Sequence, residues 1–311
     1  MATAFVFPGQ GSQSVGMGSA LADAFPVARA TFEEVDEAVG RGLSTIMWEG
    51  PMETLTLTVN AQPALMAHSI AMLRVLEKEA GVDLARIKFV AGHSLGEYSA
   101  LCAARALSLS DTARLLRLRG EAMQEAVPPG EGAMAALLGV DLATAEKAIA
   151  AAGGEGVCDI ANDNAPGQVV ISGDKGKVEA AIESAKALGA KMAKLLPVSA
   201  PFHSSLMAPA AKRMKEALAA TTVRTPIVPV VANVTARETR VPDDIKRLLV
   251  EQVTGRVRWT ESVSYMTAEG CDAFVEIGSG KVLAGLIKRI AKEAKTLSVG
   301  EPSDLDAFAK L

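Results

Sequence analysis

The sequence predicts an α/β protein in which a parallel sheet carries helices on both faces and a ferredoxin-like subdomain is inserted into it. Two patterns support this expectation. Short β-rich runs alternate with segments of helical periodicity along most of the chain, which is typical of a parallel sheet. In one stretch the expected order changes to βαββαβ, which is the ferredoxin-like signature. With 311 residues and 49% hydrophobic content, the chain is long enough to bury a large core.

The elements of the main sheet follow from local composition and spacing. Apolar, β-rich runs predict strands at residues 4–7, 87–91, 227–232 and 273–277. Apolar residues at three-and-four spacing predict helices at residues 60–78, 110–126, 205–219, 243–254 and 281–292.

The inserted subdomain is expected at residues 128–198, and the core at residues 1–127 and 199–311. Prolines mark both ends, with Pro128-Pro129-Gly130 at the entry and the segment from Pro197 to Pro201 at the exit. The strands expected between these ends are residues 132–140, 157–161, 168–172 and 191–198, and the helices are residues 142–152 and 175–188.

The pentapeptide Gly92-His93-Ser94-Leu95-Gly96 has the context of a nucleophile elbow, because an expected strand precedes it and a helix-like segment follows. Glycines flank the serine in such a turn because a side chain there would clash with neighbouring backbone. The following helix would point free N–H groups at a developing oxyanion. Ser94 is therefore the candidate nucleophile. The alternative is an ordinary helix N-cap, for which serine is favoured.

A serine nucleophile needs a general base within hydrogen-bond reach, and the chain has three histidines. His93 adjoins Ser94, and consecutive residues at a sharp turn point apart, so His93 is expected to support the elbow. His68 lies among apolar neighbours in an expected helix, which favours a packed structural role. His203 follows Pro201-Phe202 in a loop, a common place for catalytic residues. We therefore expect His203 to be the base.

The glycine-rich loop Phe7-Pro8-Gly9-Gln10-Gly11-Ser12-Gln13 follows the first expected strand. It does not match the phosphate-binding patterns, since neither GxxxxGK[ST] nor GxGxxG occurs there. If the first strand lies near the elbow strand, the N–H groups of Gln10 and Leu95 could form an oxyanion hole. The alternative is a glycine turn shaped only for tight packing.

Two arginines in one expected helix, Arg117 and Arg119, cannot share a helical face because they are two residues apart. One could be solvated while the other points inward. A buried arginine needs an anionic partner, and a substrate carboxylate could serve as that partner.

Composition excludes several other classes of protein. The net charge of −4 and the absence of long Lys/Arg runs argue against nucleic acid as a partner, because phosphate binding needs clustered cations. Cys102, Cys158 and Cys271 lie far apart and form no CxxC pair, so we expect no disulfide framework and no metal site. No segment resembles a signal peptide or reaches the roughly 20 apolar residues that cross a bilayer. We therefore expect a cytoplasmic protein with no membrane partner.

Taken together, Phe7-Pro8-Gly9-Gln10-Gly11-Ser12-Gln13, Gly92-His93-Ser94-Leu95-Gly96-Glu97 and Pro201-Phe202-His203-Ser204 resemble the motifs of malonyl-CoA:acyl carrier protein transacylases. The resemblance covers nearly the whole chain. It implies an α/β-hydrolase-like core joined to a ferredoxin-like subdomain. It also implies transfer of malonyl from malonyl-CoA to the phosphopantetheine thiol of an acyl carrier protein, with no cofactor. We expect a monomer.

The resemblance also implies roles for individual residues. Ser94 would be the nucleophile, His203 its base and later the acid, and the N–H groups of Gln10 and Leu95 the oxyanion hole. Arg119 would bind the malonyl carboxylate, because a planar guanidinium can make two parallel charge-assisted hydrogen bonds. Three further positions match residues of the family's substrate site: Gln252 near the histidine, the polar Asn162, and the bulky Phe202 that disfavours an α-methyl branch.

Two other functions remain open from the residues. An α/β serine hydrolase such as a thioesterase would have its acid between the serine and a histidine near the chain end. Here a long segment follows His203, although Asp159 or Asp163 could be proposed as the acid. A non-catalytic scaffold that docks carrier proteins is the other alternative.

Carrier proteins of this family's systems are acidic, so the resemblance implies a cationic docking patch. Lys191 and Lys194 flank the His203 segment and are the candidates for it. Taken alone, a lysine such as either of these is more often a solvated surface charge. Both fatty acid and polyketide synthesis are compatible with these residues.

Overall fold

The computed structural model describes residues 2–40, 42–198 and 200–311. Residues 1 and 199, at which the two expected core segments begin, lie outside the described residues. The main sheet has six strands in the order β11-β10-β1-β2-β7-β8, and all neighbours are parallel except the pair of β7 and β8. The strands are β1 (Thr3–Phe7), β2 (Phe89–Gly92), β7 (Val230–Ala232), β8 (Arg237–Thr239), β10 (Ala273–Ile277) and β11 (Lys295–Val299).

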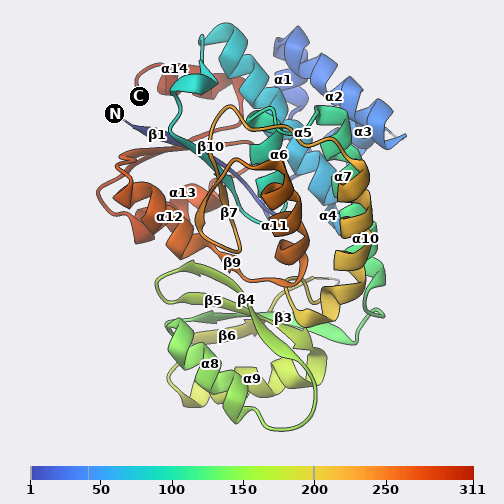
Figure 1. Cartoon of the computed structure of the whole chain (residues 1–311), viewed down its shortest axis with the longest axis vertical. Coiled ribbons are helices and arrows are strands. Elements are labelled where there is room, and N and C mark those ends of the chain that lie inside the picture. The colour runs from blue at the N-terminus through green and yellow to red at the C-terminus, as the bar shows by residue number, and fades with distance from the viewer. Residues whose placement is uncertain (1, 41, 199) are drawn as a thin grey trace.

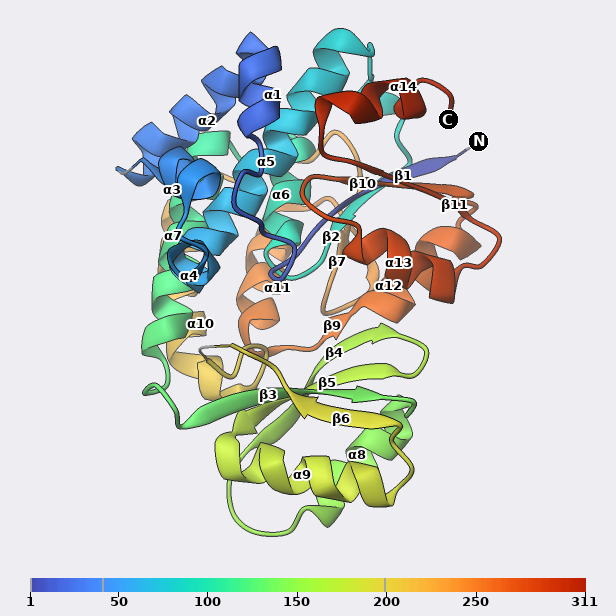
Figure 2. The same cartoon turned by 180° about the vertical axis from the view of Figure 1, so that it is seen from behind.

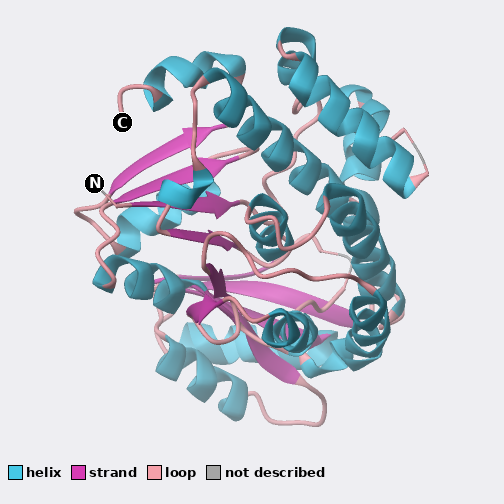
Figure 3. Cartoon of the chain, turned by 45° about the horizontal axis from the view of Figure 1, so that its top comes forward, coloured by secondary structure: helices cyan, strands magenta, loops and turns pink. Residues whose placement is uncertain are grey.

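Helices cover both faces of this sheet, and alternate residues of each strand face opposite layers (Figures 1 and 3). Phe5 and Phe7 of β1 pack into the larger core, whereas Ala4 and Val6 pack into a smaller core on the other face. The smaller core is closed by α12 (Trp259–Ala268) and α13 (Val282–Ile290). The larger core is formed with α1 (Ser19–Ala24), α2 (Pro26–Val39), α3 (Leu43–Glu49), α4 (Met52–Thr56), α5 (Thr58–Glu79), α6 (Gly96–Ala103), α7 (Leu109–Glu125), α10 (Ala208–Ala220), α11 (Pro242–Thr254) and α14 (Leu305–Phe308).

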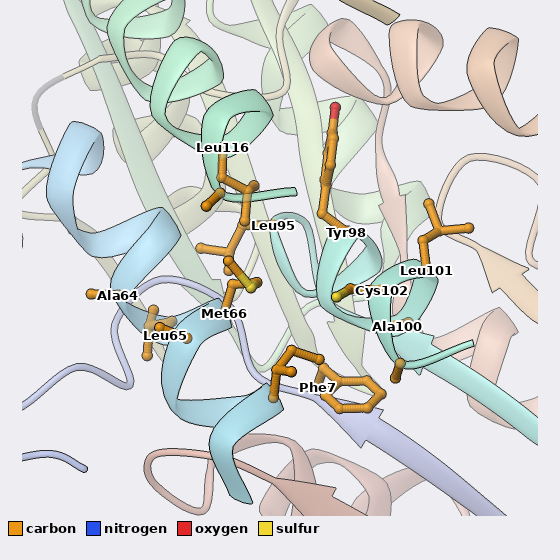
Figure 4. Close-up of a cluster of buried hydrophobic side chains, with 14 of the residues drawn as sticks. Phe7, Ala64, Leu65, Met66, Leu95, Tyr98, Ala100, Leu101, Cys102 and Leu116 are labelled. Atoms are coloured by element: carbon orange, nitrogen blue, oxygen red, sulfur yellow. The ribbon is translucent and has the colours of Figure 1, made fainter. Parts of the chain in front are cut away.

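The larger core continues up to the elbow that the sequence predicts. Figure 4 shows Leu95, which precedes α6, beside Met66 from α5 and Leu116 from α7, with Phe7 from β1 in the same cluster. All four side chains are at most 1% exposed. Since close-packed interiors resist displacement, this cluster holds the start of α6 firmly against the sheet.

The second sheet follows the expected βαββαβ order and lies below the main sheet in Figures 1 and 2. Its strand order is β6-β3-β5-β4-β9. α8 and α9 pack on one face through a separate apolar cluster. The elements are β3 (Gly132–Leu138), α8 (Leu142–Ala151), β4 (Cys158–Ala165), β5 (Gln168–Asp174), α9 (Lys175–Ala187), β6 (Met192–Leu195) and, from far along the chain, β9 (Val257–Arg258).

Among the expected elements whose bounds differ, three begin late or end early beside a proline. The strand expected at 227–232 begins at Val230, because Pro229 cannot donate to the ladder. The strand expected at 191–198 ends at Leu195, two residues before Pro197. The helix expected at 205–219 opens with a 3-10 turn (Ser205–Met207), and its α-helical part has a proline in the first turn.

Several elements were not expected at all: the N-terminal helices α1 to α4, α12, α14 and the short strands β8, β9 and β11.

In the part of the chain that the structure describes, no helix combines the length and the apolar character that crossing a bilayer requires.

Candidate active site

Ser94 lies on the sharp turn between β2 and α6, with its backbone in the left-handed region (φ 54°). A Cβ on Gly92 would lie 1.9 Å from the carbonyl carbon of Gly96, and one on Gly96 would lie 2.3 Å from the Phe7 oxygen. Only glycine fits at either position, as a nucleophile elbow requires. Leu95, rather than Ser94, is the N-cap residue of α6, so the N-cap alternative for Ser94 is wrong.

His203 meets the elbow serine directly. Its Nε2 lies 2.6 Å from Ser94 Oγ. Its Nδ1 lies 2.9 Å from the Gln252 carbonyl oxygen and 3.1 Å from that of Gly255. Because a carbonyl oxygen only accepts, Nδ1 carries the proton and Nε2 is free to accept one from the serine.

No side-chain acid orients His203 among the described residues. Asp159 accepts hydrogen bonds from the N–H (2.7 Å) and the hydroxyl (2.9 Å) of Ser205. Asp163 accepts from Thr260 Oγ1 at 2.9 Å. Both candidates for a third catalytic member are therefore wrong, because main-chain carbonyls do the orienting instead.

The environment of His203 keeps its imidazole neutral. The side chain is 3% exposed, and burial lowers its pKa to about 3, with the nearby Arg119 charge acting in the same direction. The neutral form is the one that can take a proton from Ser94. The pair is therefore in its basic state throughout the neutral range.

Arg119 is 2% exposed and bonds only to neutral acceptors. Its Nη1 donates to Gln62 Oε1 at 2.7 Å, and its Nη2 donates to Gln252 Oε1 at 3.0 Å and to Ser94 Oγ at 3.1 Å. Its guanidinium carbon lies 5.7 Å from the centre of the Tyr98 ring. No carboxylate of the described chain forms a salt bridge with it, and its Nε has no partner there. A buried cation in this state suits an incoming carboxylate.

The two arginines of α7 do occupy different surroundings. Arg117 is partly buried, pairs with Glu121 at 2.9 Å and donates to Asn60 Oδ1 at 3.0 Å. Arg119 is held deep because α7 lies close against α5, where a Cβ on Gly120 would come within 2.6 Å of the Val59 Cα. The inward arginine of the sequence analysis is therefore Arg119.

The glycine-rich loop lies beside the elbow because β1 and β2 are parallel neighbours, with Phe7 opposite Gly92. Gln10 and Leu95 both line the cavity in front of Ser94. Within residues 2–40, 42–198 and 200–311, neither of their N–H groups has a protein acceptor. Thr58 Oγ1 donates to Gln10 Oε1 at 3.0 Å, which fixes the side chain of this turn.

A cavity of about 450 Å³ brings most of the expected site residues together. Gln252 does not line the cavity, but it bonds to Arg119, which does. Lys191 and Lys194 do not line the cavity, although both are exposed and the segment after β6 does line it. The expected residues around the cavity are Gln10, Ser94, Leu95, Arg119, Asn162, Phe202 and His203, joined by Gln62, His93, Asn164 and Gln168.

The other two histidines have the supporting positions that the sequence suggested. His93 Nε2 lies 2.8 Å from Asn164 Oδ1 of β4, which ties the elbow to the second sheet. His68 is buried in α5 with Nε2 2.8 Å from the Gly300 carbonyl oxygen.

Two site residues were missed by the sequence analysis. Asn233 Oδ1 accepts from the Ser94 N–H at 2.8 Å, and Asn233 Nδ2 donates to the Gly92 oxygen at 2.7 Å. Its position directly after β7, at the carboxyl edge of a parallel sheet, was the available signal. Glu97 lies buried in the first turn of α6. In the described residues, no group of three or more His, Cys, Asp or Glu side chains could hold a metal ion.

A serine on a nucleophile elbow, a neutral histidine and a buried arginine around one cavity define a serine-dependent acyl-transfer site. The chain belongs to the acyl transferase domain family, whose sequence pattern matches residues 4–301. It is 49% identical to the malonyl CoA-acyl carrier protein transacylase of Bacillus subtilis, over 97% of this chain and 95% of that protein. It is 46% identical to the protein of that name in Escherichia coli K12, over 99% of each chain.

Solved structures agree with these sequence matches. The crystal structure of the acyl-carrier-protein-S-malonyltransferase from Bartonella henselae is 55% identical, with a TM-score of 0.97 over 100% of this chain and 99% of that one. A type II PKS acyl-carrier protein in complex with its malonyl-transacylase gives 41% identity and a TM-score of 0.96, over 100% of this chain and 99% of that one.

Proposed function

We propose that this chain transfers the malonyl group from malonyl-CoA to the phosphopantetheine thiol of an acyl carrier protein, through a malonyl ester on Ser94. One observation supports this most directly. Ser94 Oγ lies 2.6 Å from the base nitrogen of His203 and 3.1 Å from a buried guanidinium nitrogen of Arg119. A nucleophile and a carboxylate-binding group therefore meet at one oxygen. The names of the relatives point to the same reaction.

In the first half-reaction, His203 Nε2 takes the Ser94 proton while Oγ bonds to the thioester carbonyl carbon. The N–H groups of Gln10 and Leu95 stabilise the resulting oxyanion. The C–S bond then breaks, and the imidazolium gives its proton to the leaving thiolate. Malonyl-Ser94 and free coenzyme A result.

In the second half-reaction, the carrier-protein thiol gives its proton to His203 and attacks the ester carbonyl carbon. The same N–H groups hold the oxyanion. The bond to Ser94 Oγ breaks, and the imidazolium returns the proton to that oxygen. The malonyl thioester leaves on the carrier protein, and the sequence of steps is ping-pong.

Arg119 binds the malonyl carboxylate in both half-reactions. Its Nη2, which donates to Ser94 Oγ in this structure, takes the carboxylate as its new acceptor. Gln252 Oε1 accepts from the same nitrogen, and Gln62 Oε1 holds the other terminal nitrogen, Nη1. Phe202 and Asn162 line the space beside the acyl group, where a bulky ring disfavours an α-methyl branch.

The carrier protein is proposed to dock near Lys191 and Lys194. Both are exposed at the edge strand of the second sheet, and residues 196–198 lead from there into the cavity. In this proposal residues 128–198 form a docking subdomain on a core of residues 1–127 and 199–311. The reaction uses no cofactor, and we place the enzyme in the cytoplasm because its three cysteines are free.

Intact mass after mixing with malonyl-CoA tests the proposal. We expect one malonyl adduct, absent in Ser94→Ala and discharged by carrier protein rather than by water. Rapid discharge by water would instead indicate a serine hydrolase. Full transfer activity in Ser94→Ala would refute the covalent mechanism and favour a docking scaffold.

A further inference from the structure

A buried carboxylate lies directly behind the elbow and has no role in the proposed steps. Glu97, in the first turn of α6, is 2% exposed. Its Oε2 accepts from the Asn233 N–H at 2.9 Å and from Gln252 Nε2 at 2.8 Å. Burial raises its pKa to about 7. Because burying a carboxylate is costly, its presence calls for a function beyond packing.

The two residues that Glu97 contacts hold the reacting groups through their side chains. Gln252 Oε1 accepts from Arg119 Nη2 at 3.0 Å, and Gln252 Nε2 also donates to the Ser94 carbonyl oxygen at 3.0 Å. Asn233 Oδ1 accepts from the Ser94 N–H at 2.8 Å. One carboxylate is thus linked by a single intervening side chain to both the nucleophile and the substrate-binding arginine.

The chemistry of an amide makes its orientation decisive. One end of the Gln252 side chain only accepts hydrogen bonds and the other only donates. A carboxylate accepts, so Glu97 requires the NH₂ end of Gln252 to face it, which leaves Oε1 for Arg119. The opposite orientation would place the NH₂ group against the guanidinium, where both partners are donors.

We propose that Glu97 is a positioning residue for malonyl recognition, which fixes the orientation of Gln252 and through it the guanidinium of Arg119. This inference rests on the proposed role of Arg119 as the carboxylate-binding residue. The requirement is for an acceptor at Oε2 rather than for a charge. Protonation of Glu97 at Oε1 leaves this acceptor in place.

Two substitutions separate the acceptor from the charge. Glu97→Gln keeps an acceptor because both bonds of Glu97 end on the same oxygen, which the glutamine carbonyl can replace. Glu97→Met has a similar length and no such acceptor. We expect Glu97→Met to lower kcat/KM for malonyl-enzyme formation by roughly 10²-fold, the effect of a misplaced binding group. Acetyl-enzyme formation should fall less than about tenfold, and Glu97→Gln should stay within about tenfold of the unmodified enzyme for both.

Glu276 provides a matched control. It is a fully buried carboxylate of β10 that accepts from the N–H groups of Leu283 and Ala284 at 3.0 and 2.8 Å. Glu276→Met should lower the melting temperature and leave the malonyl-to-acetyl preference unchanged. If Glu97→Met does not fold, Glu97→Asp replaces it, because the shorter side chain keeps the charge but cannot reach both donors.

The rates are measured by intact mass over a range of malonyl-CoA and acetyl-CoA concentrations. Loss of malonyl preference in Glu97→Met, or in Glu97→Asp in its place, with recovery in Glu97→Gln, supports the inference. Equal losses for both substrates, or a Glu97→Gln enzyme that loses the preference as well, overturn it. Failure of the unmodified protein to form a malonyl adduct would instead refute the proposed function itself.

Discussion

The main sheet and the second sheet face the same cavity, but they supply different kinds of side chain. The strands and helices of the main sheet bring Ser94 and Arg119, whose positions are fixed by close packing and buried hydrogen bonds. The second sheet brings Met134, Asn162 and Val170, which carry no charge. The comparison indicates that the nucleophile and the buried arginine belong to the main sheet and its helices, whereas the second sheet lines the cavity with uncharged side chains and, in our proposal, carries the docking face. The predictions below test this division.

The largest effect is expected at the elbow. Ser94→Ala should lower malonyl transfer by roughly 10⁴-fold or more, because no other group can form the ester. Intact mass and a transfer assay measure this, and the melting temperature confirms folding. Adduct formation at another residue would contradict the assignment of reactivity to the elbow.

Loss of the guanidinium should come next. Arg119→Ala should lower kcat/KM for malonyl-CoA by roughly 10²- to 10³-fold, as truncation of a buried charged partner does, and acetyl-CoA far less. Arg114→Ala is the matched control on the same helix, since the Arg114 side chain is exposed and pairs with Asp111 at 3.3 Å on the surface. Equal losses for the two substrates would remove Arg119 from carboxylate recognition.

The pH dependence of acylation should show how far burial and the Arg119 charge lower the pKa of His203. Because its pKa is lowered to about 3, the base form persists on acidification, and acylation should not fall near the ordinary histidine value of about 6.5. Arg119→Ala should move the inflection upward, because the nearby positive charge opposes protonation. A fall in kcat/KM centred near 6.5 in the unmodified enzyme would contradict this.

The same shift affects stability with a definite sign. The folded protein keeps His203 neutral, whereas the unfolded chain takes up a proton below about 6.5, so stability is lost as the pH falls below that value. Circular dichroism at each pH therefore separates loss of fold from loss of catalysis.

A change in the wall of the cavity should alter selectivity rather than reactivity. Phe202→Ala removes a bulky ring from the lining and should raise the rate with methylmalonyl-CoA relative to malonyl-CoA by roughly 10- to 100-fold, the usual range for one methyl group. Competition between the two substrates, read by intact mass, measures the ratio. An unchanged ratio would mean that another residue excludes the branch.

The smallest effect is expected on the docking face. Lys191→Glu and Lys194→Glu together should slow discharge to an acidic carrier protein by roughly tenfold at low ionic strength, while acylation by malonyl-CoA is unaffected. Lys78→Glu, at the end of α5 and exposed, is the control. If the discharge rate and its salt dependence are unchanged, these two lysines take no part in docking.

Local rules explain which parts of the site could be predicted from the sequence. Ser94 was identifiable because Gly92 and Gly96 are required by the turn itself. The acceptors for His203 were not identifiable. They are the main-chain carbonyls of Gln252 and Gly255, and every residue type has such a carbonyl. Asn233 also escaped, since only tertiary structure brings it to the Ser94 N–H.

The same reasoning applies to the fold. The long amphipathic helix α7 and the βαββαβ order have strong periodic signals. The helices α1, α3 and α4 have only five to seven residues each, too few to show a period. β9 has two residues, and its pairing with β4 depends on a contact between segments far apart in the chain.

That short strand has a consequence for protein engineering. Residues 252–258 carry both carbonyls that orient His203 and then pair with β4 at Asn162 and Asp163. The boundary between the two sheets is therefore not a clean cut for domain exchange. A chimaera that takes its second sheet from a relative would need to import Val257 and Arg258 with it, or the transplanted sheet would lose an edge partner and the catalytic imidazole its alignment.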